Sequence, residues 1–146
     1  MKKNAFTLVE ILIVVVILGI LATIVIPKFS EASSEAKTSS LTKNLQNIRA
    51  SIQYYKVQHN DSLPGSSSGV SFVEALLNPT NMAGEIVANS AIEAKGPYLN
   101  KIPQNPFNNL DTVELNGTLG NGSHGWNFNT TTGAFYADDS NEHSEL

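Results

Sequence analysis

The chain has 146 residues, a formal net charge of −4 and no cysteine. The absence of cysteine excludes disulfides, thiolate catalysis and cysteine–zinc sites. The acidic balance lacks the basic face that nucleic-acid binding requires, so no nucleic-acid partner is expected. The length suits one small domain together with one additional segment.

An almost unbroken apolar run extends from Phe6 to Ile26. About 21 helical residues would span roughly 31 Å, which matches the hydrocarbon thickness of a bilayer. Lys2 and Lys3 precede the run, so the positive-inside tendency predicts a cytoplasmic amino terminus and a body across the membrane. A secretory signal peptide is the alternative, but its apolar region is usually shorter and ends in a small-x-small cleavage site.

One carboxylate, Glu10, lies inside this apolar run. A charged side chain deep in a bilayer costs roughly 2.5–3.5 kcal/mol on insertion scales, so an acid in such a run is a candidate functional residue. The alternative is an acid about one turn inside the membrane whose side chain reaches the interface. The question is therefore which group Glu10 pairs with.

The helix is expected to continue past Pro27 to about Asn60. Pro27 removes one backbone donor, which predicts a bend or one loosened turn. Further along, apolar residues recur at spacings of four and three on an otherwise polar helix, which predicts one buried stripe. The members of this stripe are Leu41, Leu45, Ile48, Ile52 and Tyr55.

The segments after the helix predict loops and one short helix. Turn residues at 60–69 end the long helix, and a helical segment at 72–77 stops before Pro79. Three prolines in the segment 96–107 exclude regular helix and central strand. We expect an extended ordered loop there, anchored by Tyr98, Ile102 and Phe107.

The last third of the chain shows the alternation and turn residues of strands. The expected strands contain Val113 with Leu115, Trp126-Asn127-Phe128 and Ala134-Phe135-Tyr136. We therefore predict an α+β fold in which a small antiparallel sheet of about three strands packs on the long helix.

Two patterns are weak evidence for catalysis or cofactor binding. Residues 120–125 satisfy the string GxGxxG, but they precede a strand, whereas the dinucleotide fingerprint follows one and opens a helix. We interpret them as a turn. His59, His124 and His143 lack metal-site spacing, so surface positions are expected for all three.

The amino-terminal residues resemble the class III signal of type IV pilins and type II secretion pseudopilins. The resemblance rests on the leader 1–5, the sequence FTLVE at 6–10, the apolar run and Pro27. It implies that a membrane-embedded prepilin peptidase cuts between Ala5 and Phe6 and methylates the new amine of Phe6. Ala5 departs from the family, which usually has glycine before the cut.

The same resemblance implies that Glu10 and Pro27 are assembly residues. In the filaments of this family, the acid neutralises the amino-terminal ammonium of a neighbouring subunit. The implied architecture is a helix that anchors the monomer and later forms the centre of the filament, with the body outside.

The body is most similar to the major, G-type pseudopilin of type II secretion. Gly96-Pro97-Tyr98-Leu99, Lys101-Ile102-Pro103 and Asn105-Pro106-Phe107-Asn108 follow its patterns GPYL, KLP and DPWG, with Asn105 and Phe107 replacing aspartate and tryptophan. The carboxyl-terminal loop of that family commonly binds calcium, although no recognisable copy of the loop is present. Asp111, Asp138 and Asp139 are the calcium candidates, and a solvated acidic tail is the alternative.

We therefore expect a structural filament subunit and not an enzyme, most specifically a pseudopilin that polymerises from the inner membrane to drive protein secretion. A type IV pilus subunit for adhesion, motility or DNA uptake is one alternative. A monomeric single-pass membrane protein with a ligand-binding periplasmic domain is the other.

The expected organisation is a leader at 1–5, a membrane and assembly helix at 6–27, its amphipathic continuation at 28–60 and a periplasmic or extracellular body at 61–146. The expected partners are other copies of the chain, other pilins or pseudopilins, the prepilin peptidase, an inner-membrane assembly platform and membrane lipid.

Overall fold

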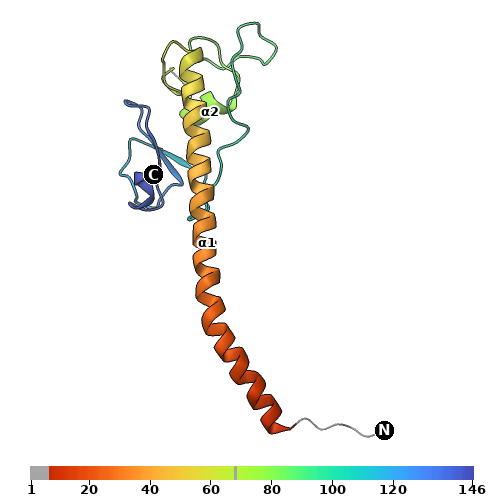
Figure 1. The fold of residues 1–146 in the computed structure, drawn as a ribbon. Coiled ribbons are helices and arrows are strands. Elements are labelled where there is room, and N and C mark those ends of the chain that lie inside the picture. Colours follow the sequence, from red (N-terminus) through yellow and green to blue (C-terminus); the bar gives the residue numbers. More distant parts are fainter. Residues whose placement is uncertain (1–6, 68) are drawn as a thin grey trace. The chain divides into compact units, whose positions relative to one another are not determined.

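The computed structural model describes residues 7–67 and 69–146. The α+β class is confirmed: one long helix, one short helix and a three-stranded sheet are present (Figure 1). In chain order the elements are α1 (Leu8–Gln58), α2 (Phe72–Leu77), β1 (Val113–Leu115), β2 (Trp126–Phe128), β3 (Phe135–Ala137) and the 3-10 turn η1 (His143–Glu145).

The chain divides into two compact units, Met1–Lys37 and Thr38–Leu146, and α1 contributes to both. In the first unit every described residue is exposed, and the helix passes through Pro27 without ending. By length and composition α1 is able to cross a membrane. The first unit is therefore a helix without a core of its own.

In the second unit, the predicted stripe on α1 forms one side of the core. Its five side chains are at most 1% exposed: Leu41, Leu45, Ile48, Ile52 and Tyr55. They belong to one cluster with the aromatic side chains of α2, β2 and β3. The periodicity of the helix thus translates directly into burial, as expected for an amphipathic helix that packs on one side.

Aromatic rings fill the other side of the core. The ring centroid of Phe72 lies 4.1 Å from that of Phe128, and Trp126 lies 5.6 Å from Phe135. The indole nitrogen of Trp126 donates a hydrogen bond of 2.8 Å to the carbonyl of Pro103. This bond fixes the loop 96–107 to the core, as a buried indole N–H requires a partner.

The anchors predicted for that loop are confirmed. Ile102 is buried, while Tyr98 and Phe107 are partly buried and pack against the same cluster. The loop has no regular secondary structure other than turns, in keeping with its prolines.

Helix α2 begins with a capping box formed by Ser71 and Glu74. The Ser71 hydroxyl accepts a bond of 3.2 Å from the backbone N–H of Glu74, whose carboxylate accepts one of 2.9 Å from the backbone N–H of Ser71. The hydrogen bonds from Ser71 lower the pKa of Glu74. The helix ends at Leu77, two residues before Pro79.

The sheet corrects one detail of the predicted fold. Strands β2 and β3 are antiparallel, but β1 pairs with β2 in parallel, so the sheet is mixed. The reason is the connection 116–125, which is long enough to bring the chain back to the end at which β1 began. A short hairpin turn, such as the one between β2 and β3, permits only the antiparallel arrangement.

The pairing register gives the two faces of the sheet different chemistry. Trp126 and Phe128 belong to the core, and because side chains alternate along a strand, Asn127 between them points to the opposite face. Asn127 pairs with Glu114 on β1 and with Tyr136 on β3. This outer face is therefore polar.

Arg49 on α1 connects the helix to the end of the sheet. Its Nε and one terminal nitrogen donate to the carbonyl of Phe135 at 3.0 and 2.8 Å, and the other terminal nitrogen donates to Leu146 at 2.9 Å. These charge-assisted bonds are stronger than neutral ones and set the position of β3 along α1.

Replacing Ile48 by alanine should lower the free energy of unfolding of the body by about 2–5 kcal/mol, because the change leaves a cavity between α1 and the sheet. Gln46→Ala, on the exposed side of the same helix turn, should change it by less than about 0.5 kcal/mol. Denaturation of the full chain in detergent, followed by fluorescence of Trp126, the one tryptophan, measures both. Equal losses in the two variants would contradict this packing.

Candidate functional site

The first unit presents apolar side chains in every direction around α1. The large apolar residues from Leu8 to Phe29 are 47–82% exposed. A continuous apolar surface of this kind marks contact with lipid or with other protein chains.

Glu10 has a partner close by in its own chain. Its Oε2 accepts hydrogen bonds from the backbone N–H and the hydroxyl of Thr7, both at 3.4 Å, and its backbone N–H donates to the Thr7 hydroxyl at 3.2 Å. This is the reciprocal pattern of a capping box. The two bonds to the carboxylate are long, and both go to the same oxygen.

Of the other predicted processing and assembly residues, the structure describes Pro27 alone. Ala5 and Phe6, the predicted cleavage site, lie outside the described residues. Pro27 lies inside α1 and is exposed.

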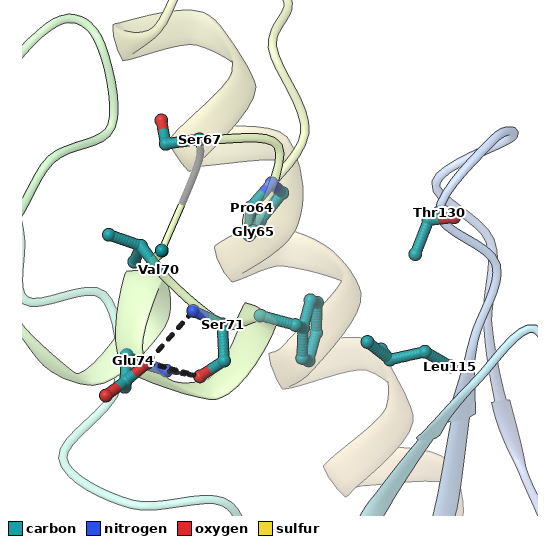
Figure 2. A pocket seen from close by; sticks show the side chains of 10 residues that line it. Pro64, Gly65, Ser67, Val70, Ser71, Glu74, Leu115 and Thr130 are labelled. Carbon is teal, nitrogen blue, oxygen red and sulfur yellow. Dashed lines mark hydrogen bonds between the residues drawn. The ribbon is translucent and has the colours of Figure 1, made fainter.

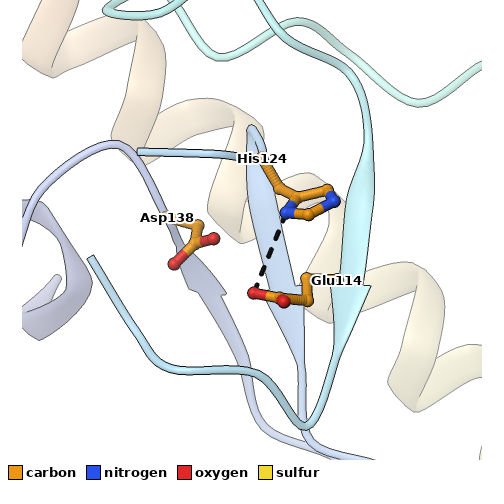
Figure 3. A group of neighbouring side chains, drawn as sticks. All are labelled: Glu114, His124 and Asp138. Carbon is orange, nitrogen blue, oxygen red and sulfur yellow. Dashed lines mark ion pairs between the residues drawn. The ribbon is translucent and has the colours of Figure 1, made fainter. Parts of the chain in front are cut away.

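The polar face of the sheet brings together three side chains that are distant in sequence. Glu114 lies on β1, His124 in the connection 116–125, and Asp138 directly after β3 (Figure 3). One ligand atom from each lies within 4.8 Å of the others. His124 Nδ1 is 3.8 Å from Glu114 Oε2.

Asp138 is the most buried member of this cluster, with 0% of its surface exposed. Its Oδ1 accepts a bond of 2.7 Å from the backbone N–H of Gly120. Burial raises the pKa of Asp138 above its ordinary value, and the nearby charge of Glu114 raises it further. The fold thus holds a carboxyl group where ionisation is unfavourable unless a cation is close.

Of the three acids predicted as calcium candidates, Asp138 alone belongs to this group. Asp139 points elsewhere, because its Oδ1 accepts from Asn105 at 2.7 Å and its Oδ2 lies 2.5 Å from His143 Nδ1. Asp111 is exposed on the segment before β1. The sequence analysis missed Glu114 and His124, since only the pairing of the strands reveals that they are close to Asp138.

The surface position predicted for His59 is wrong. His59 is 1% exposed, its ring stacks on Tyr55 at 3.8 Å, and its two nitrogens bond to the Tyr55 carbonyl and the Thr80 hydroxyl. The physical reason is visible in the sequence: His59 follows Tyr55 by four residues and therefore extends the buried stripe. The side chains of His124 and His143 are partly buried.

A groove of about 440 Å³ lies between residues 64–67 and 69–71, the first turn of α2 and the side chains of Leu115 and Thr130 (Figure 2). Glu74 is the one ionisable side chain among its described lining residues. Its Oε2 accepts both hydrogen bonds from Ser71. The groove offers no pair of groups for acid–base chemistry among these residues.

Glycines allow the connection 116–125 to approach its neighbours closely. A Cβ on Gly125 would lie 2.1 Å from the carbonyl oxygen of Leu110, which is a severe clash with backbone. Gly120 has a φ of +73°, and a Cβ there would lie 2.3 Å from the side chain of Asn141. The position of His124 therefore depends on glycines on both sides.

Comparisons with known proteins agree on one family. A family model described as "Prokaryotic N-terminal methylation motif" matches residues 1–26. The type II secretion system core protein G of Pseudomonas aeruginosa is 34% identical over 82% of this chain and 78% of the relative. The core protein G of Escherichia coli is 30% identical over 79% and 73% of the two chains, and that of Vibrio cholerae 30% over 74% and 68%. No solved structure matches.

Gly125→Ala should destabilise the body by about 1–3 kcal/mol, because the new methyl group forces the loop away from the carbonyl of Leu110. Ser123→Ala, an exposed position in the same loop, should change stability by less than about 0.5 kcal/mol. Urea titrations of the full chain in detergent compare the two. A Gly125→Ala variant as stable as the parent would show that the loop does not depend on this contact.

Proposed function

The chain belongs to the family of the type II secretion system core protein G, the major pseudopilins, and on that premise we propose that it assembles with further copies of itself through α1 into a filament that serves protein secretion. In this proposal its role is structural and not catalytic. The observation that carries it is the exposed apolar surface of the first unit.

The apolar surface suits the subunit both in the membrane before assembly and in the filament after it. Before assembly, lipid covers the side chains from Leu8 to Phe29, and the helix is long enough to span the bilayer once. After assembly, the same side chains contact α1 of neighbouring subunits. Lipid contact is exchanged for protein contact, so the step needs no unfolding of the body, whose core is separate.

The membrane orientation follows from charge. Lys2 and Lys3 favour an amino terminus in the cytoplasm, and the body then lies in the periplasm of a bacterium. The matched methylation motif supports cleavage before Phe6 and methylation of its amine by a prepilin peptidase. Further proposed partners are other pseudopilins and an assembly platform in the inner membrane.

Glu10 is proposed to bind the amino-terminal ammonium of Phe6 in a neighbouring subunit. In the isolated chain both hydrogen bonds to its carboxylate come from Thr7, are 3.4 Å long and end on Oε2. Bonds of this length are weak, and a charge-assisted bond to an ammonium group is shorter and stronger. A charge that is costly in lipid thereby gains its counterion only on assembly.

Glu10→Ala should reduce the yield of filaments at least about tenfold, because a loss of about 1.4 kcal/mol in the contact between subunits weakens its association constant tenfold, while insertion and processing continue. Thr7→Ala is the matched control, because it removes the helix cap and leaves the carboxylate free for a neighbour. Immunoblots of sheared filaments and of whole membranes measure the two pools. If Thr7→Ala is as defective as Glu10→Ala, the acid acts only as a helix cap and the proposed pairing is wrong.

Mass spectrometry of the membrane-extracted chain should find a mature form that begins with N-methylated Phe6. Ala5→Gly should increase the processed fraction, since glycine is the usual residue before the cut in this family. A chain that retains residues 1–5 in cells with an active prepilin peptidase would favour the single-pass membrane protein over the filament subunit.

A further inference from the structure

The cluster of Glu114, His124 and Asp138 on the polar face of the sheet takes no part in the proposed assembly. Its three side chains come from β1, from the connection 116–125 and from the residue after β3, and they converge on one point (Figure 3). Carboxylate and imidazole are ordinary ligands of divalent metals. Convergence of acids alone is common on protein surfaces, but three features distinguish this cluster from such surface groups.

The first unusual feature is that Asp138 is fully buried with one oxygen unused. Oδ1 accepts from Gly120, but Oδ2 has no hydrogen-bond partner. Figure 3 shows one oxygen of the Asp138 carboxyl group on the side of Glu114 and His124. A buried carboxylate oxygen without a partner costs free energy and in a native protein calls for a ligand, an ion or a water.

The second feature is the clustering of buried polar side-chain atoms that lack a hydrogen-bond partner. Within the described residues, the buried side-chain atoms that lack a hydrogen-bond partner are His124 Nδ1, Asn127 Nδ2 and Asp138 Oδ2. Two belong to the cluster, and the third is on Asn127, the register partner of Glu114 on the same face. The unsatisfied polar groups of the body are therefore concentrated at one place.

The third feature is that the ligands are held in place. A Cβ on Gly117 would lie 2.0 Å from the carboxyl carbon of Glu114, so glycine at this position makes room for that carboxylate. Asn121 Nδ2 donates to Glu114 Oε2 at 3.3 Å. Such second contacts orient a ligand toward its metal.

A direct bond within the cluster does not account for these observations. The 3.8 Å between His124 Nδ1 and Glu114 Oε2 is too long for a hydrogen bond. It is close to the separation of about 3.3 Å between two ligands that bind one tetrahedral zinc ion at about 2.0–2.1 Å. The ligand atoms lie within 4.8 Å of one another, so they have to approach by at most about 1.5 Å to reach that separation.

We propose that Glu114, His124 and Asp138 bind one divalent transition-metal ion of the zinc type. Zinc accepts nitrogen and oxygen ligands together and needs four, so three side chains and one water complete the site. Calcium prefers six to eight oxygens, which one imidazole and two carboxylates do not supply. The bound ion would link β1, the connection 116–125 and the end of β3, and would satisfy Asp138 Oδ2.

The test uses the full, untagged chain in detergent, first stripped with a chelator. We expect one zinc per chain by elemental analysis after dialysis, and an increase in the melting temperature of about 10 °C when free zinc is about 100 times Kd. Fluorescence of Trp126, which is fully buried on β2, reports the melting of the body.

His124→Ala and Asp138→Asn should abolish both zinc binding and the thermal shift. Asn at 138 retains an oxygen that accepts from Gly120, so this variant is expected to fold without metal, and its Trp126 emission checks this. His143→Ala is the matched control, because this histidine pairs with Asp139 outside the cluster and the variant should keep the full response to zinc.

Failure of the wild-type chain to bind zinc, or an undiminished response in both cluster variants, overturns the proposal. A thermal shift with calcium but not with zinc overturns the choice of metal. The experiment makes no use of polymerisation, so these outcomes are separate from those that decide the proposed function.

Discussion

Burial of one face of α1 is the interaction on which the rest of the body depends. Each strand of the sheet has only three residues, and a sheet this small is not stable by itself in water. The helix supplies five fully buried side chains, each of which contributes roughly 1.5–3 kcal/mol when removed from water. The loop 96–107 has no regular structure of its own, so its position depends on its contacts with this core. The helix is therefore the element on which the sheet, the short helix and the loop all pack.

Because side chains alternate along each strand, the sheet has one apolar face and one polar face. One face carries Trp126 and Phe128 into the core, and the other carries Glu114 and Asn127. In many small sheets the outer face is simply hydrated. Here the connection 116–125 and the segment after β3 cover part of this face. Asn127 and Asp138 are therefore at most 2% exposed. Polar groups that are covered in this way require partners, whereas the same groups in water would not.

Much of this fold was predictable because its determinants are local. The spacing of apolar residues predicted the stripe from Leu41 to Tyr55. Helix α2 likewise begins after a Ser-x-x-Glu capping box and ends before a proline, which are both local sequence signals. The direction of β1 was not predictable, since it depends on where the connection 116–125 crosses the sheet and not on the residues of the strand. The burial of His59 does not follow from the chemistry of histidine, but its spacing of four residues from Tyr55 places it on the stripe.

The polar cluster was likewise not predictable from the sequence. Glu114, His124 and Asp138 have no motif spacing, and they meet only because β1 lies beside β2 and β2 beside β3. The N-terminal signal, in contrast, is contiguous, and a family model of the methylation motif matches residues 1–26. Sequence reading succeeds where function is encoded along the chain and fails where the fold has to bring the residues together.

The uniform apolar surface of the first unit has a consequence for geometry. Because its large side chains are exposed all around the helix, a neighbouring helix can rotate or slide by one turn, about 5.4 Å, and still cover a similar apolar area. Apolar contact therefore supplies cohesion but leaves many near-equivalent settings of two subunits. One polar group inside such a surface removes this degeneracy, since all settings but one leave its charge in a medium that cannot solvate it. In the proposed filament, with the pairing proposed for Glu10, cohesion and precision of stacking are carried by different side chains of the same helix.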